Sequence, residues 1–257
     1  MNTRSFIISG AGSGIGRAIA VKVANADSRN RVILLGRNAG RLSETLSALP
    51  NAKEHKIIAA DVGSAKELKK AIHDAQLDKM NLCGIVSNAG IGGSNHYGEN
   101  DRWDEIIQTN LTGTYRFVQE CLPALKASSE SYKNIVVVSS ILAKLGVPGY
   151  SAYCASKAGL LGLTRSWAAE LARDKILVNA INPGWVDTDM ARSGINAIAS
   201  GTGGSFEDAL KGQMDQVPLG KMSAPSEIAE LIYLLLDAKQ TSITGQTLDI
   251  NNGALMN

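Results

Sequence analysis

The segment YSAYCASK (150–157) places a phenol and an amine four residues apart, at Tyr153 and Lys157. On a helix these two side chains share one face, with Cβ atoms about 5–6 Å apart. A phenol has a pKa of about 10, so alone it is a poor acid or base at neutral pH. A neighbouring ammonium stabilises the phenolate, and we therefore expect Lys157 to lower the pKa of Tyr153 into a useful range for proton transfer. An exposed helix pair without chemistry is the alternative for this motif by itself.

Two further polar residues add to that pair. Ser140 ends the apolar run NIVVVSS (134–140), which places it at the carboxyl edge of a strand, where ligands bind in open α/β sheets. Its hydroxyl would donate to a substrate carbonyl while Tyr153 delivers the proton. Asn110 interrupts an apolar helical stretch, where asparagine lowers helix propensity. We expect it to hold a backbone group or a water molecule; a solvent-facing residue is the alternative.

A glycine-rich motif, SGAGSGIG (9–16), lies between an apparent strand and an apparent helix. Gly10 would permit the tight turn out of the strand. Gly14 would let the backbone approach a pyrophosphate, and Gly16 would let the helix pack closely on the sheet. The phosphates would lie at the N-terminus of the helix over 15–26, where free amides and the helix dipole favour negative charge. The spacing G-x-x-x-G-x-G is not the commoner one, so an ordinary glycine-rich turn remains open at this point.

These residues need a sheet and helices to position them. Apolar runs that predict strands recur at 5–9, 31–36, 56–61, 83–90, 134–140, 176–184 and 245–251. Amphipathic stretches between them lie at 15–26, 64–76, 101–127, 153–173 and 225–238. Continuous apolar strands alternating with helices indicate an α/β fold with a doubly wound, seven-stranded parallel sheet of Rossmann type. Residues 1–257 form a single domain in this interpretation.

The segment 190–220, which we call the lid segment, is rich in Gly, Ser and Ala. We expect it to be the least structured part of the chain and to act as a mobile substrate lid, because long irregular segments in compact domains are often functional.

The composition excludes several classes of protein. Of 257 residues, 44% are hydrophobic and 19% charged, which is typical of a globular domain, and the net charge is only +2. No basic run predicts nucleic-acid binding, and no segment predicts a membrane span or a signal peptide. Cys83, Cys121 and Cys154 are widely spaced and are expected to be reduced packing residues of a cytoplasmic protein. The three histidines show no spacing of metal ligands, so we predict no metal site.

Together these motifs resemble the short-chain dehydrogenase/reductase family, along essentially the whole chain. SGAGSGIG is similar to its cofactor loop, with Ser9 where threonine is usual, and SNAG (87–90) to its NNAG motif. INPGWVDTDM (181–190) is similar to its PGxVxT segment. The four positions of its catalytic tetrad are occupied by Asn110, Ser140, Tyr153 and Lys157. The cofactor contacts that the resemblance implies are Gly10, Ser13, Gly14, Ile15, Gly16, Arg37, Asn38, Asp61, Val62, Asn88, Ala89, Gly90, Tyr153, Lys157, Pro183, Gly184, Val186 and Thr188.

The resemblance implies an NAD(P)(H)-dependent oxidoreductase that interconverts a carbonyl compound and an alcohol. Tyr153 would be the general acid or base, and Ser140 would polarise the carbonyl. Lys157 would lower the pKa of Tyr153 and bind the nicotinamide ribose, and Asn110 would hold a water that relays protons from Lys157. Thr188 would contact the nicotinamide carboxamide, and the pair Asp61-Val62 the adenine. A homotetramer is usual in the family, and the small residues Ala155, Gly159 and Gly162 suit a helical interface.

NADP(H) is the expected cofactor, with NAD(H) possible. In dinucleotide folds an acidic residue about 20 positions beyond the glycine loop binds the adenosine ribose and repels a 2′-phosphate. The corresponding position here is Gly36, which carries no carboxylate and is followed by Arg37 and Asn38. A guanidinium pairs bidentately with phosphate, and Asn38 would add a neutral hydrogen bond. Ser13 stands where many NADP-dependent relatives carry a second basic residue, so a solvated Arg37 with dual cofactor use is the alternative.

The substrate is less well defined by sequence. The nearest likeness within the family is to 3-oxoacyl-thioester reductases, but steroid, sugar and xenobiotic carbonyl reductases share the same segments. A non-catalytic NAD(P)-binding regulatory protein on the same fold, and an epimerase or dehydratase of the extended family, are further hypotheses. We expect the pocket to use apolar residues Leu142, Leu145, Val147 and Trp185 and polar residues Asn95 and His96, although His96 is more simply explained as a surface histidine.

Overall fold

The computed structural model describes residues 3–237 and 239–256. Within them a single sheet has the strand order β3-β2-β1-β4-β5-β6-β7, with every neighbouring pair parallel. The strands are β1 (Arg4–Ser9), β2 (Asn30–Gly36), β3 (Lys56–Ala59), β4 (Leu82–Ser87), β5 (Lys133–Val138), β6 (Ile176–Pro183) and β7 (Thr247–Ile250). The helices are α1 (Gly14–Ala26), α2 (Ala39–Ser47), α3 (Ala65–Ala75), α4 (Trp103–Ile107), α5 (Gly113–Lys126), α6 (Ser151–Leu171), α7 (Asp189–Thr202), α8 (Phe206–Met214) and α9 (Pro225–Leu236). The predicted fold class is confirmed.

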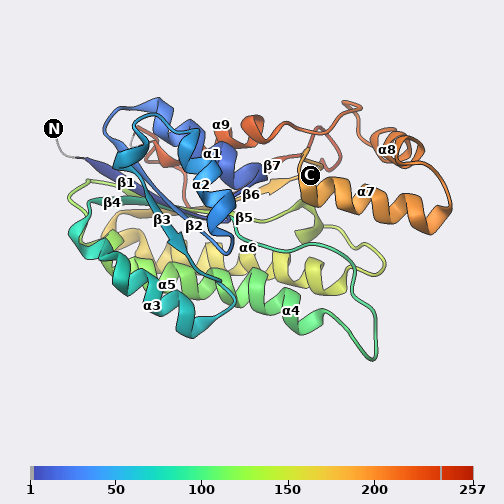
Figure 1. Ribbon diagram of the computed structural model, residues 1–257, viewed down its shortest axis with the longest axis horizontal. Helices are drawn as coiled ribbons and strands as arrows, with labels where there is room; N and C mark the ends of the chain where they lie inside the picture. Colours follow the sequence, from blue (N-terminus) through green and yellow to red (C-terminus); the bar gives the residue numbers. More distant parts are fainter. Residues whose placement is uncertain (1–2, 238, 257) are drawn as a thin grey trace.

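Helices cover both faces of the sheet, as Figure 1 shows: α1, α2 and α9 lie on one face and α3, α5 and α6 on the other. Each face has its own apolar core, with Ile19, Leu42 and Ile232 in one and Leu68 and Phe117 in the other. The central strands β1, β4, β5 and β6 are buried along their whole length. Burial on both faces explains why their sequences are continuously apolar rather than alternating.

The helix expected over 101–127 is divided into three pieces. Between α4 and α5 the residues Gln108–Thr112 form a π-helical turn, in which the Gly113 amide bonds back to the Gln108 carbonyl. Such turns are rare and bulge one residue out of the regular helix, often at functional sites. Asn110 lies in the middle of this turn, so the local irregularity is centred on a predicted site residue.

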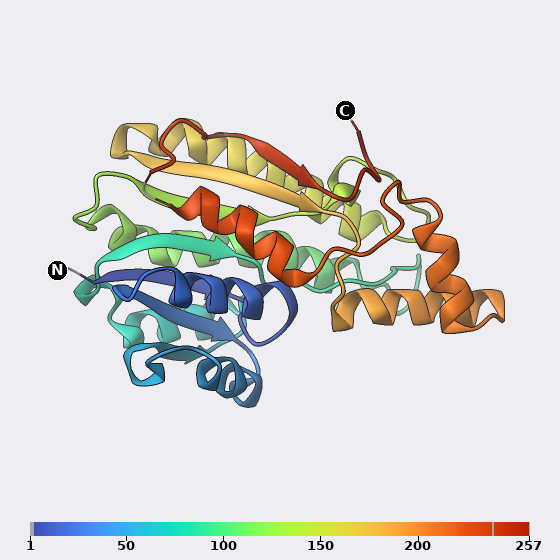
Figure 2. The ribbon, with the colours of Figure 1, turned by 90° about the horizontal axis from the view of Figure 1, so that it is seen from above.

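The lid segment is helical, and the prediction that it is the least structured part of the chain is wrong. It is occupied largely by α7 and α8, whose first turns are capped by side chains. Thr188 Oγ1 accepts from the Ala191 amide and Ser205 Oγ from the Asp208 amide. These caps satisfy amides at the helix start and outweigh the glycine content. Figure 2 shows both helices beyond the carboxyl ends of the strands, away from the layered core.

Among the described helices, none is long and apolar enough to cross a membrane. All three cysteines are free, as predicted; Cys83 and Cys121 are buried and Cys154 is half-buried.

Candidate active site

A cavity of about 820 Å³ opens at the carboxyl ends of the central strands. Its lining comes from the loops that follow β1, β2, β3, β4, β5 and β6 and from the lid segment. Open parallel sheets bind ligands at this edge, because the connections on either side of the central strands leave to opposite faces there. All 18 predicted cofactor-binding residues except Gly16 line this cavity, together with Ser140.

The glycine loop has the geometry expected from its sequence. Gly10 has φ +67°, in the left-handed region that favours glycine, and a Cβ there would lie 2.9 Å from Ala89 Cα. A Cβ at Gly16 would lie only 2.1 Å from the Gly10 carbonyl oxygen. Gly16 therefore lets α1 pack against the turn, as predicted, although it does not face the cavity itself. Gly14, at φ +49°, lies beside the Thr188 side chain on the opposite wall.

A buried hydroxyl joins the loops after β1 and β4. Ser9 Oγ accepts from the amides of Asn88 and Ala89, each at 3.0 Å. The Asn88 side chain donates in return to the Ser9 and Gly10 carbonyls. Ser9 therefore fixes the turn geometry that the glycines permit, in place of the usual threonine of the family.

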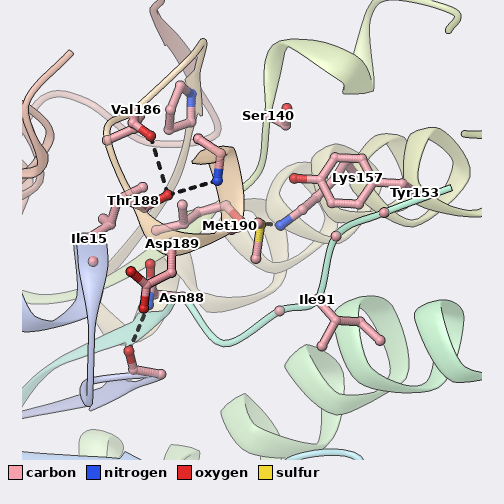
Figure 3. A pocket seen from close by; sticks show the side chains of 18 of the residues that line it. Ile15, Asn88, Ile91, Ser140, Tyr153, Lys157, Val186, Thr188, Asp189 and Met190 are labelled. Carbon is pink, nitrogen blue, oxygen red and sulfur yellow. Dashed lines mark hydrogen bonds between the residues drawn. The ribbon is translucent and has the colours of Figure 1, made fainter. Parts of the chain in front are cut away.

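Tyr153 and Lys157 share one face of α6, as predicted. Figure 3 shows the Tyr153 hydroxyl pointing into the cavity with Lys157 beside it, and Lys157 Nζ lies 5.6 Å from the Tyr153 ring centroid. Lys157 is only 5% exposed and donates to the Val138 carbonyl at 3.0 Å. Ser139, at the end of β5, donates to the Lys157 carbonyl and ties the helix to the strand.

Burial controls the protonation of both groups. It raises the pKa of Tyr153 to about 12, against a smaller lowering by a hydrogen bond with Ser140. It lowers the pKa of Lys157 to about 8, because a buried ammonium loses its hydration. The expectation that Lys157 brings the pKa of Tyr153 below 10 is therefore wrong for this structure. Desolvation is the largest cause of the shift in the pKa of Tyr153, and the Lys157 ammonium lies over the ring.

Asn110 is fully buried, so the solvent-facing alternative is wrong. Its side chain accepts from the Ile91 amide at 2.8 Å and donates to the Ile91 carbonyl and to Ser156. It thus holds the loop after β4 against α6. A Cβ at Gly90 would lie 3.1 Å from Asn110 Oδ1 and 3.7 Å from Lys157 Nζ, so Gly90 keeps the space between these two residues clear.

The far wall of the cavity belongs to the segment after β6. Thr188 caps α7, and its methyl group faces Gly14. In Figure 3 Thr188, Asp189 and Met190 follow one another along this wall, and the Met190 side chain projects toward Lys157. The predicted apolar pocket residues all line the cavity: Leu142, Leu145, Val147 and Trp185.

The end of the cavity beyond the glycine loop is polar. Arg37 and Asn38 line it at the end of β2, and Arg37 is exposed. The Asn38 side-chain oxygen caps α2 by accepting from the Arg41 amide, which orients the side chain at this end of the cavity. Asp61 lies at the end of β3 and accepts from the Gly63 amide, which orients its carboxylate.

Two predicted pocket residues lie elsewhere. The side-chain oxygen Oδ1 of Asn95 accepts hydrogen bonds from Ser151 Oγ and from the Ala152 amide, so Asn95 caps the start of α6. His96 is exposed and does not line the cavity, as the simpler explanation expected. Among the lining residues that the sequence did not single out are Arg41, Asp189, Met190, Ile198, Gln213, Gln216, Val217 and Ala254. Arg41 follows Arg37 by four positions, a spacing visible in the sequence. The places of the residues between 190 and 217 depend on how the lid segment folds.

Comparison with known proteins shows the family of the chain. Residues 10–254 match a family model described as Enoyl-(Acyl carrier protein) reductase. The 3-oxoacyl-[acyl-carrier-protein] reductase FabG of Staphylococcus aureus (strain Mu50 / ATCC 700699) is 33% identical, over 99% of this chain and 99% of its own. FabG of Escherichia coli (strain K12) is 30% identical, over 97% of this chain and 96% of its own.

Solved structures of reductases superimpose on this chain over nearly its whole length. A variant of actinorhodin polyketide ketoreductase with NADPH superimposes with a TM-score of 0.90 and 32% identity, covering 99% of both chains. Levodione reductase superimposes with a TM-score of 0.87 and 25% identity, covering 98% of both chains. With a family model matched over residues 10–254 and curated relatives at least 30% identical over nearly the whole chain, the chain belongs to the short-chain dehydrogenase/reductase family and is an oxidoreductase.

Proposed function

We propose that this enzyme is an NADP(H)-preferring reductase of 3-oxoacyl thioesters. The observation that carries the proposal is the cluster of Ser140, Tyr153 and Lys157 on one side of a cavity whose other side is a glycine cradle. Supporting it, the FabG relatives are named as 3-oxoacyl-[acyl-carrier-protein] reductases, and the ketoreductase relative was solved with NADPH.

The residues present fit a nicotinamide dinucleotide. Gly10 and Gly14 line the cavity with positive φ, and the α1 N-terminus begins there without a side-chain cap. Free amides at a helix start bind phosphate well. Arg37, Asp61 and Val62 would hold the adenosine end, and Thr188, Tyr153 and Lys157 the nicotinamide end. When bound, the cofactor supplies the hydride.

The protein's own part is proton transfer and orientation. A Tyr153 with a pKa of about 12 keeps its proton at neutral pH, so its hydroxyl can give that proton to a carbonyl oxygen. Ser140 would donate a second hydrogen bond to the same oxygen and stabilise the charge that develops there. Lys157, with a pKa of about 8, is mainly charged at neutral pH and would stabilise the phenolate left on Tyr153. Asn110 would hold a water between Lys157 and solvent, which returns the proton.

The cavity suits an acyl substrate because of its apolar wall. Leu142, Leu145 and Val147 follow Ser140 along the chain and line the cavity, and Ile198 and Val217 of the lid segment line it too. This lining lies beyond the reacting groups, where a hydrocarbon chain would extend from the reacting carbonyl. We propose that the lid segment closes over the substrate as rigid helices rather than as a coil.

The test is a turnover panel with the purified enzyme. A 3-oxoacyl thioester, a cyclic diketone, a steroid ketone and an oxidised sugar are each supplied with NADPH and with NADH. We expect the thioester and NADPH to give the highest kcat/KM. Preference for one of the other ketones would replace the substrate assignment, preference for NADH would replace the cofactor assignment, and no turnover with any pair would favour a regulatory binding protein.

We also propose a homotetramer in the cytoplasm. On α6, Ala155 and Gly162 are exposed, and nothing lies within 4 Å of a Cβ built at Gly162. Gly159, the third small residue of the predicted interface, instead packs against Leu111 of its own chain. Sedimentation at micromolar concentration is expected to show four copies, and a monomer would refute this assembly.

A further inference from the structure

An ion pair crosses the polar end of the cavity. Arg41, in the first turn of α2, places Nη1 3.4 Å from Oδ2 of Asp189, the first residue of α7. Both residues line the cavity, and their side chains are 53% and 77% exposed. A pair this exposed contributes little stability and is easily exchanged for a better partner.

Arg41 lies over the glycine loop. A Cβ built at Gly12 would be 3.1 Å from Arg41 Cβ, so the backbone of α2 at this point contacts the loop that would hold the pyrophosphate. Arg37 lines the same part of the cavity from the end of β2. The chain therefore offers two guanidinium groups there, one of them engaged by a carboxylate.

Asp189 belongs to a short stretch, Thr188 to Met190, that we call the strap. Each of its residues contacts a different wall: Thr188 faces Gly14 and Met190 faces Gly92, both at 3.0–3.1 Å from the Cβ position of the glycine. Among the described residues, Arg41 forms the ion pair with Asp189, and Asp189 also interacts electrostatically with Arg192. The pair with Arg41 is a strap contact at the cavity that the charge of a ligand can change directly.

We propose that Arg41 is a second residue that reads the 2′-phosphate of NADP(H), and that it exchanges Asp189 for the phosphate when the cofactor binds. The proposal rests on the proposed use of NADP(H). A phosphate carries more charge than a carboxylate and accepts two parallel bonds from a guanidinium. Asp189 does not need Arg41, because a carboxylate in the first turn of a helix is stabilised by the helix dipole. NAD(H) has no such phosphate and leaves the pair intact, so the two cofactors leave the strap in different states.

The first measurement uses ligands without nicotinamide. Calorimetry gives the affinities of adenosine 2′,5′-bisphosphate and of 5′-AMP for the parent and for Arg41→Gln, Arg37→Gln, Asp189→Asn and the double variant Arg41→Gln/Asp189→Asn. We expect Arg41→Gln to weaken the bisphosphate about tenfold and to leave 5′-AMP unchanged. Asp189→Asn is expected to tighten the bisphosphate a few-fold in the parent, since Arg41 is then free, and not in the Arg41→Gln background.

Arg192→Gln is the matched control. Arg192 also pairs with a carboxylate next to the strap, that of Asp187 at 2.8 Å, but does not line the cavity. This variant should leave both affinities unchanged. Thermal unfolding of every variant shows whether it is folded before its affinity is interpreted.

The outcomes separate this inference from the proposed cofactor preference. If Arg37→Gln removes the difference in affinity between the bisphosphate and 5′-AMP and Arg41→Gln does not, Arg41 does not bind the 2′-phosphate. The proposed preference for NADP(H) then still stands. If the parent binds the two ligands alike, both proposals fail. If Asp189→Asn raises the affinity for the bisphosphate equally in the parent and in the Arg41→Gln background, Arg41 does not exchange Asp189 for the phosphate.

Hydrogen exchange tests the strap itself. Amides of residues 188–194 are expected to exchange faster with the bisphosphate bound than with 5′-AMP bound, because the ionic contact is then broken. Equal exchange in the two complexes contradicts release of the strap.

Discussion

The two sides of the cavity are held in place in different ways. The side formed by the ends of β1, β4, β5 and α6 is fixed by buried groups: Ser9, Asn110 and Lys157 are each 5% exposed or less, and each bonds to backbone. The side formed by the strap and the lid segment buries apolar residues such as Ile195 and Val217, but where it meets α2 its contact is the exposed pair of Arg41 and Asp189. Under the proposed function, chemistry would depend on the first side, which we call rigid, and choice of ligand on the second, which we call adjustable.

The largest expected effect is on the rigid side. Tyr153→Phe keeps the ring and removes the transferable proton, so turnover should fall by about 10²–10⁴-fold while cofactor affinity persists. Steady-state kinetics and a fluorescence titration with NADPH measure the two quantities. Near-normal turnover in a folded variant would remove Tyr153 from the mechanism.

Gly16→Ala tests how strictly the glycine loop is packed. A methyl group there would lie 2.1 Å from the Gly10 carbonyl oxygen and 2.7 Å from Asn88 Nδ2, so α1 must move away from the turn. We expect a loss of about 2 kcal/mol or more in the free energy of unfolding. Urea denaturation measures it, and wild-type stability would show that this side is more adjustable than described.

Lys157 should make stability depend on pH. Its pKa is lowered to about 8 in the folded protein from an ordinary value of 10.5, so between these values the unfolded chain binds more protons. Stability therefore rises with pH in this window, and from pH 7 to 9.5 the contribution is about 2 kcal/mol. The difference in unfolding free energy between the parent and Lys157→Met should grow in the parent's favour by this amount. A difference that does not change with pH would mean that Lys157 is not desolvated.

Lys157→Ala should also weaken both turnover and cofactor affinity, because the lysine has two proposed roles. Unchanged affinity for NADPH in the titration would remove the ribose contact and leave only the electrostatic role.

The smallest effect on the free energy of unfolding is expected on the adjustable side, where a glycine is replaced by alanine as in Gly16→Ala. Gly201 lies near the end of α7, and nothing is within 4 Å of its Cβ position. Gly201→Ala should raise the unfolding free energy by about 0.5–1 kcal/mol, since alanine favours the helix. Clear destabilisation would show that α7 is packed more tightly than the structure indicates.

The contrast between the two sides of the cavity also explains which parts of the structure could be predicted from the sequence. Strands β1 and β5 and the roles of Gly10 and Gly16 follow from steric and apolar patterns that few folds satisfy. Helices α7 and α8 are not evident from composition, because their glycine content masks the capping residues Thr188 and Ser205. Helix α2, capped by Asn38, also lies outside the predicted amphipathic stretches.

Electrostatic details were less accessible. The pKa of Tyr153 depends on how deeply α6 buries it, and the partner of Arg41 lies 148 positions away. Neither depth nor long-range pairing is encoded in local spacing. Local spacing points to the groups that we propose to react, but not to the balance between burial and charge that sets their protonation.

The hydroxyl of Ser9 has a consequence for the order of folding. It bonds to the Asn88 amide across 79 positions of sequence, because β2 and β3 are wound to the outside before the chain returns to β4. Contacts between such distant positions form late, since the intervening chain must first be ordered. As the chain is synthesised, the glycine loop emerges before β4, and the hydrogen bonds that fix its shape form only when β4 docks beside β1. A dinucleotide therefore cannot guide the early steps of folding and stabilises only the assembled domain, by mass action.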